Sequence, residues 1–357
     1  MAPSHAVYMD DRIADREVGN TGQRLLRPRV RYVSETTPNA LLGLNEAQER
    51  VVQELGATGE QRPVFPDGLA VGLRERLTTG LQSVAANLDD SDNLFISKFL
   101  LSQVLGCEAR HIHELQREFA WSVPVARGTV AHKAIELSVH WRTVPVANEL
   151  VDQSIATLTN NGSPIADYLL HLPEAERAQL RSEAANSTQA FLDGFPPLRA
   201  KPQWRPAVEV RGRYEFLNSK LVLSGKVDLT LGGPTGDRSG RVFIDLKTGR
   251  RSRTHVDDLR FYALIETVRY GTPPRALASY YLDESRLSVE TVSQDLLWSA
   301  ADRVIAGVER HQTLLNGEDV PIYRPGIACR WCPMQSECET GKAWLAATDE
   351  DELQILS

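Results

Sequence analysis

The pattern of hydrophobic and polar residues divides the chain into helical stretches around a central block of alternating residues. Apolar residues with helical spacing predict helices over residues 44–56, 73–88, 93–118, 128–142 and 174–193. Alternating, β-rich segments predict strands over residues 208–210, 214–216, 220–231 and 241–247. The rest of the pattern predicts a strand over 276–282 between helices over 256–270 and 293–315. Helices, then a sheet, then helices again predict a mixed α/β core.

Composition and charge then exclude several classes of protein. Of the 357 residues, 42% are hydrophobic and 24% are charged, which excludes a collagen, a coiled coil or a wholly disordered chain. No apolar run approaches the about 20 residues that span a bilayer, and the first residues do not resemble a secretory signal. The first forty residues are polar, so we expect a loose tail there. Because the net charge is -7, nucleic-acid binding would need local basic patches.

Residues 224–249 are expected to form a β-hairpin that carries two acidic residues. The strands are separated by a glycine-rich turn, and folding about that turn sets Asp228 opposite Ile244 or Asp245. Because side chains alternate along a strand, Asp245 and Lys247 share one face. The same alternation gives each strand one apolar face, formed by Val227, Leu229 and Leu231 in the first strand and by Val242, Ile244 and Leu246 in the second.

Asp228 and Asp245 are therefore candidates for a divalent-metal site. Two carboxylates held close together repel each other unless a cation lies between them. Oxygen ligands of this kind suit Mg²⁺ or Mn²⁺. Lys247 lies beside Asp245, where its amine can reach a bound water or a phosphate oxygen. The alternative is an ordinary solvated face of an amphipathic hairpin.

Other polar residues are candidates for the same site. His132, near the start of a predicted helix, is either a metal ligand or a structural histidine. Glu209, on the strand before the hairpin, is either a further carboxylate of the site or an exposed strand residue. The basic segment 249–253 is either a phosphate-backbone contact or a surface loop. Asp258 and Tyr262 lie one turn apart on the next helix, on a face that lines a groove or forms a helix edge.

The four cysteines of the chain form a second candidate site. Three lie within ten residues, as Cys329-Arg-Trp-Cys332-Pro-Met-Gln-Ser-Glu-Cys338, and Cys107 lies far upstream. Four thiolates bind either Zn²⁺ or an iron–sulfur cluster, and one remote ligand with three close ones suits a cluster better than a zinc ribbon. Four unrelated buried thiols are the alternative. So few cysteines do not form a secreted disulfide scaffold and suit a cytoplasmic protein.

These motifs together resemble the PD-(D/E)XK nuclease superfamily, in its RecB-like branch with an iron–sulfur staple. That branch includes the CRISPR-associated exonucleases and the AddB nuclease domain, and the resemblance covers roughly residues 93–342. Lys98 and Phe99 depart from the family's opening motif, and Asp258 stands where the family often has a Gln, four residues before the retained Tyr262. The matching segments are 96–107, 128–132, 225–228, 245–247 and 329–338.

The resemblance implies a fold and a set of residue roles. The fold is an α/β restriction-endonuclease-like core, with a mixed central sheet flanked by helices, whose N- and C-terminal helical parts are joined by the four-cysteine cluster. The implied catalytic residues are Asp228, Asp245, Lys247 and Tyr262. The implied ligands of Mn²⁺ or Mg²⁺ are His132, Asp228, Asp245 and the Leu246 carbonyl. The implied ligands of a 4Fe–4S cluster, or alternatively of Zn²⁺, are Cys107, Cys329, Cys332 and Cys338.

The implied activity is that of a metal-dependent DNA nuclease. It would be a phosphodiesterase, an exonuclease on single-stranded or end-bearing DNA, in repair, recombination or phage defence. The chain has no P-loop motif, so a helicase or defence-system partner would be a separate chain. The alternatives are a non-catalytic DNA-binding scaffold subunit of a helicase–nuclease complex and a zinc-stapled protein of unrelated function. We expect a cytoplasmic protein without membrane contact, divided into an N-terminal extension over 1–90, a nuclease domain over 91–345 and an acidic tail over 346–357.

Overall fold

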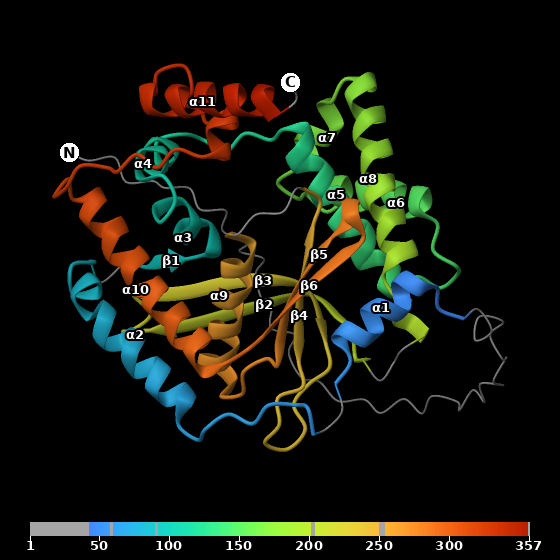
Figure 1. Cartoon of the computed structure of the whole chain (residues 1–357), viewed down its shortest axis with the longest axis horizontal. Helices are drawn as coiled ribbons and strands as arrows, with labels where there is room; N and C mark the ends of the chain where they lie inside the picture. Colours follow the sequence, from blue (N-terminus) through green and yellow to red (C-terminus); the bar gives the residue numbers. More distant parts are fainter. Residues whose placement is uncertain (1–42, 58–59, 90–91, 201–203, 250–253, 356–357) are drawn as a thin grey trace, which may run out of the picture.

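A mixed β-sheet lies at the centre of the chain (Figure 1). The computed structural model describes residues 43–57, 60–89, 92–200, 204–249 and 254–355. The sheet runs in the order β1-β3-β4-β5-β6, and β2 pairs with β3 outside that path. β1 is parallel to β3 and β4 to β5, and the other pairings are antiparallel. The strands are β1 (Leu94–Ile96), β2 (Ala207–Phe216), β3 (Leu221–Leu231), β4 (Val242–Lys247), β5 (Ala276–Tyr281) and β6 (Arg286–Thr291).

Helices flank the sheet on both faces (Figure 1), so the predicted α/β fold class is confirmed. None of the helices in the described ranges is long and apolar enough to cross a membrane. The helices are α1 (Glu46–Leu55), α2 (Leu69–Ala86), α3 (Lys98–Val104), α4 (Glu108–Leu115), α5 (Val123–Val139), α6 (Ala147–Asn160), α7 (Ala166–His171), α8 (Glu174–Gly194), α9 (Thr254–Tyr270), α10 (Gln294–Leu315) and α11 (Glu339–Ile355).

Each face of the sheet has its own hydrophobic core. The first core packs α2, α9 and α10 against β3 and the neighbouring strands. The second packs α1, α5 and α8 against β4 and β5, and β5 is buried along its whole length. A third core joins α5, α6, α7 and α8 to one another. α1 and α2, from the predicted N-terminal extension, thus contribute to the main cores, while residues 1–42 of that extension lie outside the described residues.

The stretch 93–118 does not form the single helix that its spacing predicts. Residues 94–96 form β1 beside β3, and α3 and α4 follow as two short helices. Ser97 caps the N-terminus of α3, because its hydroxyl accepts a hydrogen bond from the Leu100 N–H at 3.2 Å. A short apolar run fits both a helix and a buried strand, and pairing with the distant β3 decides between them here.

The helix that carries His132 begins at Val123, five residues before the predicted start at Gly128. Pro124 lies in its first turn, where proline is well tolerated. His132 therefore lies in the middle of α5, and the prediction that it lies near the start of a helix is wrong. The pattern also missed α6, α7, α11 and β6, and the predicted acidic tail begins within α11.

The predicted apolar face of β4 is confirmed, whereas that of β3 is wrong. Val242, Ile244 and Leu246 of β4 all pack in the second core. In β3, Val227 packs in the first core, whereas Leu229 and Leu231 pack in the second. The strand therefore changes sides between residues 227 and 229, which is where Asp228 lies.

Candidate active site

The two acidic residues of the hairpin lie at the junction of β3 and β4. Leu229 pairs with Ile244, and the same register continued by one residue sets Asp228 opposite Asp245. The Leu246 N–H donates a hydrogen bond of 2.8 Å to Asp228 Oδ2. The Asp228 carboxylate thus takes the place of a backbone partner for β4.

β2 is distorted opposite Asp228. Glu209 has a φ of 54°, in the left-handed region that residues other than glycine rarely adopt. Its two neighbours pair with β3, but Glu209 itself does not. Its carboxylate forms an ion pair with Lys226. The sheet therefore loses its regular pairing on both sides of Asp228.

His132 reaches Asp228 from α5. Its Nδ1 lies 3.3 Å from Asp228 Oδ1. The helix can approach the end of β4 because Gly128 has no side chain, and a Cβ there would lie 3.2 Å from Thr248 Oγ1. Arg127 Nη2 also donates to the Thr248 carbonyl at 2.6 Å. The glycine therefore lets α5 pack close to β4, which sets His132 against Asp228 about one turn later.

Two lysines and a second aspartate surround Asp245. Its Oδ2 lies 2.7 Å from Lys247 Nζ, and its Oδ1 lies 3.5 Å from Lys98 Nζ. Asp258 Oδ2, from α9, lies 3.3 Å from Lys98 Nζ and 3.4 Å from Lys247 Nζ. The Asp245 side chain is only 4% exposed, so its charge depends on these lysines for neutralisation.

Tyr262 lies beneath this group, where α9 packs on β3. The ring covers Gly225, since a Cβ at Gly225 would lie 2.3 Å from a ring carbon. Lys98 Nζ lies 5.4 Å from the centre of the same ring. Gly225 therefore allows α9 to bring Tyr262 under the lysine.

The charges of the site shift one another's titration. Burial raises the pKa of Asp228, but His132, a backbone N–H and Lys98 outweigh burial and hold that pKa at about 2. Burial lowers the pKa of His132, but Asp228 and more distant carboxylates such as Glu209 outweigh it, so the pKa is raised. Burial raises the pKa of Tyr262. Asp228 is thus an anion and Tyr262 a neutral phenol at neutral pH.

The donor chemistry of these residues suits a divalent metal ion. Two carboxylates and an imidazole are ligands for Mn²⁺ and Mg²⁺. Asp245 Oδ2 is buried and accepts no hydrogen bond from any described residue, although it has Lys247 as an ionic neighbour. In the described ranges, no three His, Cys, Asp or Glu side chains are close enough to form a metal-binding group. The residues fit a metal in kind, but its binding would require the lysines to move away from Asp245.

The four cysteines line one cavity of about 400 Å³. The cavity lies between the start of α4 and residues 323–341, so the fold brings Cys107 to the other three. A Cβ at Gly341 would lie 3.4 Å from both Cys329 Sγ and Cys338 Sγ, so the glycine leaves space between the sulfurs. Burial raises the pKa of Cys332. The set fits a thiolate-bound metal in kind, although the sulfurs do not form a closed group in the described structure.

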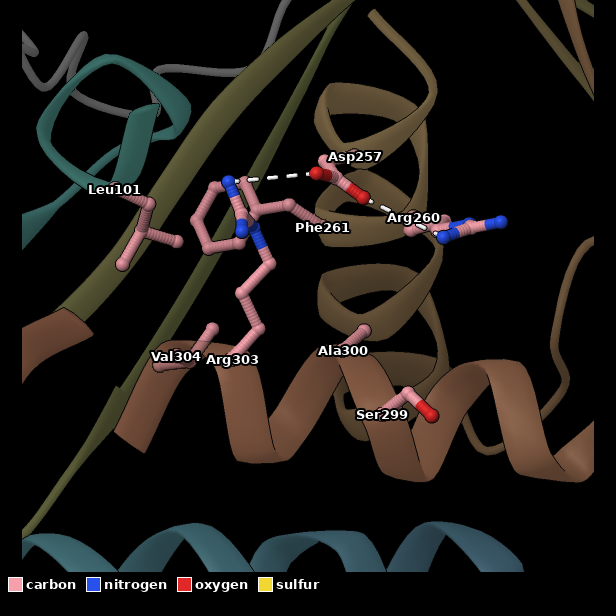
Figure 2. A pocket seen from close by; sticks show the side chains of 8 residues that line it. All are labelled: Leu101, Asp257, Arg260, Phe261, Ser299, Ala300, Arg303 and Val304. Carbon is pink, nitrogen blue, oxygen red and sulfur yellow. Dashed lines mark hydrogen bonds and ion pairs between the residues drawn. The ribbon is translucent and has the colours of Figure 1, made fainter. Parts of the chain in front are cut away.

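A smaller hollow of about 160 Å³ lies beside the site, between α3, α9 and α10 (Figure 2). Asp257 lies between Arg260 and Arg303, at 3.4 Å from each (Figure 2). Arg260 also donates to Glu290 at 2.9 Å. Carboxylates therefore neutralise both arginines, and the hollow offers a ligand little net charge. Its lining residues are Leu101, Asp257, Arg260, Phe261, Ser299, Ala300, Arg303 and Val304.

The structure thus gathers most of the predicted site residues and adds one that sequence reasoning missed. His132, Asp228, Asp245, Lys247 and Tyr262 surround one point of the sheet. The added residue is Lys98, whose only signal in the sequence is its departure from the family's opening motif. Leu246 packs its side chain in the second core. The basic segment lies almost wholly outside the described residues, at 250–253.

A family model and two solved structures show what this chain is similar to. No curated protein matches the sequence. Among solved structures, a protein of Eubacterium rectale provisionally named an exonuclease has a TM-score of 0.40 and 14% identity, covering 70% of this chain and 87% of that one. The protein SSO0001 has a TM-score of 0.30 and 12% identity, covering 76% of this chain and 97% of that one. Residues 97–339, more than half of the chain, match the PD-(D/E)XK nuclease family model. This chain belongs to the PD-(D/E)XK nuclease superfamily.

Proposed function

We propose that this chain is a metal-dependent DNA nuclease, an exonuclease that uses Mn²⁺ or Mg²⁺ on single-stranded or end-bearing DNA. The observation that carries the proposal is the meeting of His132, Asp228, Asp245 and Lys247 where α5, β3 and β4 come together. A purely structural hairpin has no need to bury an aspartate among lysines, since burying charge is costly. Charged groups with perturbed titration at one point are typical of catalytic sites. Membership of the nuclease superfamily supports the same conclusion.

Each residue of the site has a distinct role in this proposal. Asp228, Asp245 and His132 would hold the metal, with the Leu246 carbonyl as a further ligand, and the imidazole favours Mn²⁺. The bound ion would lower the pKa of a water molecule and stabilise charge on the phosphate. Lys247 would orient the attacking water or stabilise the developing charge. Asp258 and Tyr262 would support the lysines from α9.

We also propose that the four cysteines bind a 4Fe–4S cluster, with Zn²⁺ as the alternative. The shared cavity and the space beside Gly341 support this proposal. A cluster there would close a loop from Cys107 to Cys329 and stabilise the fold by about 5 kcal/mol in the cross-link entropy model. Its role would be structural, joining the N- and C-terminal helical parts. A separate helicase or defence-system chain is the protein partner that the superfamily resemblance implies.

Digestion of end-labelled DNA tests the proposed activity. Single- and double-stranded substrates are incubated with Mn²⁺, Mg²⁺ or Ca²⁺, and products that shorten from an end are expected with Mn²⁺ and Mg²⁺. Asp245→Asn and Lys247→Gln should each slow cleavage by on the order of a hundredfold or more. Asp302→Asn is a matched control, because this exposed acid pairs with Arg76 away from the site. A normal rate for Lys247→Gln would refute the site, and DNA that is bound but never cut would support the scaffold alternative.

Metal analysis tests the proposed cluster. Protein purified without oxygen should be brown and should contain iron and sulfide. Cys107→Ser should lower both the iron content and the melting temperature, because the remote ligand closes the long loop. A colourless protein that contains zinc would refute the cluster and leave the nuclease site unaffected.

A further inference from the structure

Lys98 is a charged residue held inside the candidate site. It is the first residue of α3, and its position is fixed on both sides. On one side, β1 pairs with residues 221–223 of β3. On the other, the Ser97 side chain caps α3, and Leu100 and Leu101 are buried. Lys98 is therefore anchored to the same sheet as Asp228, and its side chain keeps 34% exposure to solvent.

Lys98, Lys247, Asp245 and Asp258 form a ring of alternating charges. Each lysine contacts both aspartates, at 2.7 to 3.5 Å. A single oxygen, Asp258 Oδ2, contacts both amines. The ring is neutral as a whole, with two positive and two negative charges. Asp258 is the member that holds the two amines side by side.

A metal ion on Asp245 would change this balance. The ion and Lys98 Nζ would compete for Asp245 Oδ1, because two cations repel each other at such short range. With Asp245 bound to metal, Lys98, Lys247 and Asp258 would carry one net positive charge. A phosphodiester carries one negative charge, so it complements this group. The partly exposed Lys98 side chain, held by Asp258 beside the metal ligands, is then placed to contact it.

We infer that Lys98 is a second phosphate-binding lysine of the site and that Asp258 positions it together with Lys247. The inference rests on the proposed nuclease function and names the group that receives the DNA backbone. It has two consequences of opposite sign. Removing the charge of Lys98 relieves the competition for Asp245, so metal binding becomes tighter. The same change removes a phosphate contact, so DNA binding becomes weaker.

The experiment measures the two affinities separately. Mn²⁺ binding to the protein without DNA is followed by the electron paramagnetic resonance of the free ion. Binding of a labelled single strand is followed by fluorescence anisotropy in Ca²⁺, with a gel to confirm that the strand stays intact. For Lys98→Gln we expect about fivefold tighter Mn²⁺ binding and about fivefold weaker DNA binding. Asp258→Asn should weaken Mn²⁺ binding. Without the Asp258 charge, Asp245 is the remaining carboxylate partner of both amines in the ring, so both amines compete with the ion for it.

Two control variants separate this effect from misfolding and from general charge. Lys98→Arg keeps the charge, so it should weaken DNA binding less than Lys98→Gln does. Lys220→Gln removes a lysine at the far end of β3, where Lys220 Nζ donates to the Leu88 carbonyl, and should change neither affinity. A Lys98→Gln protein with unchanged or weaker Mn²⁺ binding, or with unchanged DNA binding, would overturn the inference. If that happens while the wild type cuts DNA and Asp245→Asn does not, only this inference fails. A wild type that neither binds nor cuts DNA overturns the proposed function as well.

Discussion

Glu108 is a buried carboxylate that fastens the C-terminal part of the chain to α4, beside the cysteine cavity. It is 1% exposed and accepts hydrogen bonds from Arg310 at 2.5 Å, from Arg324 at 3.1 Å and from the Ile322 N–H at 2.9 Å. The Glu108 N–H in turn donates to the Ile322 carbonyl at 3.1 Å. These partners lie between 202 and 216 positions away in the sequence. One side chain therefore joins the two ends of the nuclease fold.

Glu108→Gln should weaken most of the ion pairs and hydrogen bonds by which Glu108 holds the C-terminal segment. The substitution deletes the charge and turns one acceptor into an N–H donor that faces arginine donors. Removing one partner from a buried ion pair costs about 3–5 kcal/mol. Glutamine keeps one acceptor oxygen, so we expect the free energy of unfolding to fall by about 3 kcal/mol. Urea unfolding followed by tryptophan fluorescence measures this value.

Glu114→Gln is the matched control on the same helix. Glu114 accepts from Arg110 at 2.6 Å across one turn, but the pair is partly exposed. Surface pairs of this kind contribute about 0.5 kcal/mol. Hydrogen exchange should also become faster over residues 320–338 in Glu108→Gln and not in the control. Equal, small losses of stability in both variants would show that Glu108 does not fasten the C-terminal segment.

Three further predictions concern single residues. Burial and the charge of His111 lower the pKa of His311 to about 4, whereas its pKa in the unfolded chain is about 6.5. As the pH falls, the unfolded chain therefore takes up the proton first. The free energy of unfolding is thus highest above pH 6.5 and decreases as the pH falls toward 4. The free energy of unfolding, measured in urea, should therefore fall by about 3 kcal/mol more in the wild type than in His311→Gln between pH 7 and pH 4. Equal decreases in the two proteins would contradict this. His132→Ala should lower the Mn²⁺-supported cleavage rate by about a hundredfold with little change in melting temperature, whereas lost stability with an unaltered rate would show a structural histidine. Gly225→Ala should lower the free energy of unfolding in urea by about 1–3 kcal/mol, because a methyl group there collides with the Tyr262 ring. An unchanged unfolding midpoint would show that the ring moves freely.

The β-hairpin could be predicted from the sequence because its signals are local. A period of two placed Asp245 and Lys247 on one face, and α9 covers that face in the structure. The glycine-rich turn also forms near its predicted centre, since Thr235 pairs with Arg238 and Gly236 has a φ of 61°. Each of these features depends on neighbours within a few residues. The sequence pattern therefore contains them.

The rest of the site depends on contacts between distant segments. Lys98 enters the site only because residues 94–96 pair with β3, more than a hundred positions downstream. A short apolar run carries no sign of that pairing, so it reads equally well as the start of a helix. The early start of α5 was missed for a related reason. Gly128 looks like a helix boundary in sequence, but it serves the approach of α5 to Thr248.

The change of sides in β3 explains why the acidic residues meet where they do. A regular strand would pack all its odd-numbered residues in one core, but β3 contributes Val227 to one core and Leu229 to the other. Beside Asp228 the pairing is locally interrupted: β4 pairs with β3 only as far as Leu229, and Glu209 of β2 has no partner in β3, although β2 keeps the same register on either side. An unpaired Leu246 N–H would cost about 1–3 kcal/mol if buried, and the Asp228 carboxylate removes that cost by accepting it at 2.8 Å. Asp228 therefore stabilises the sheet through Oδ2, while its other oxygen, Oδ1, faces His132 in the proposed metal site.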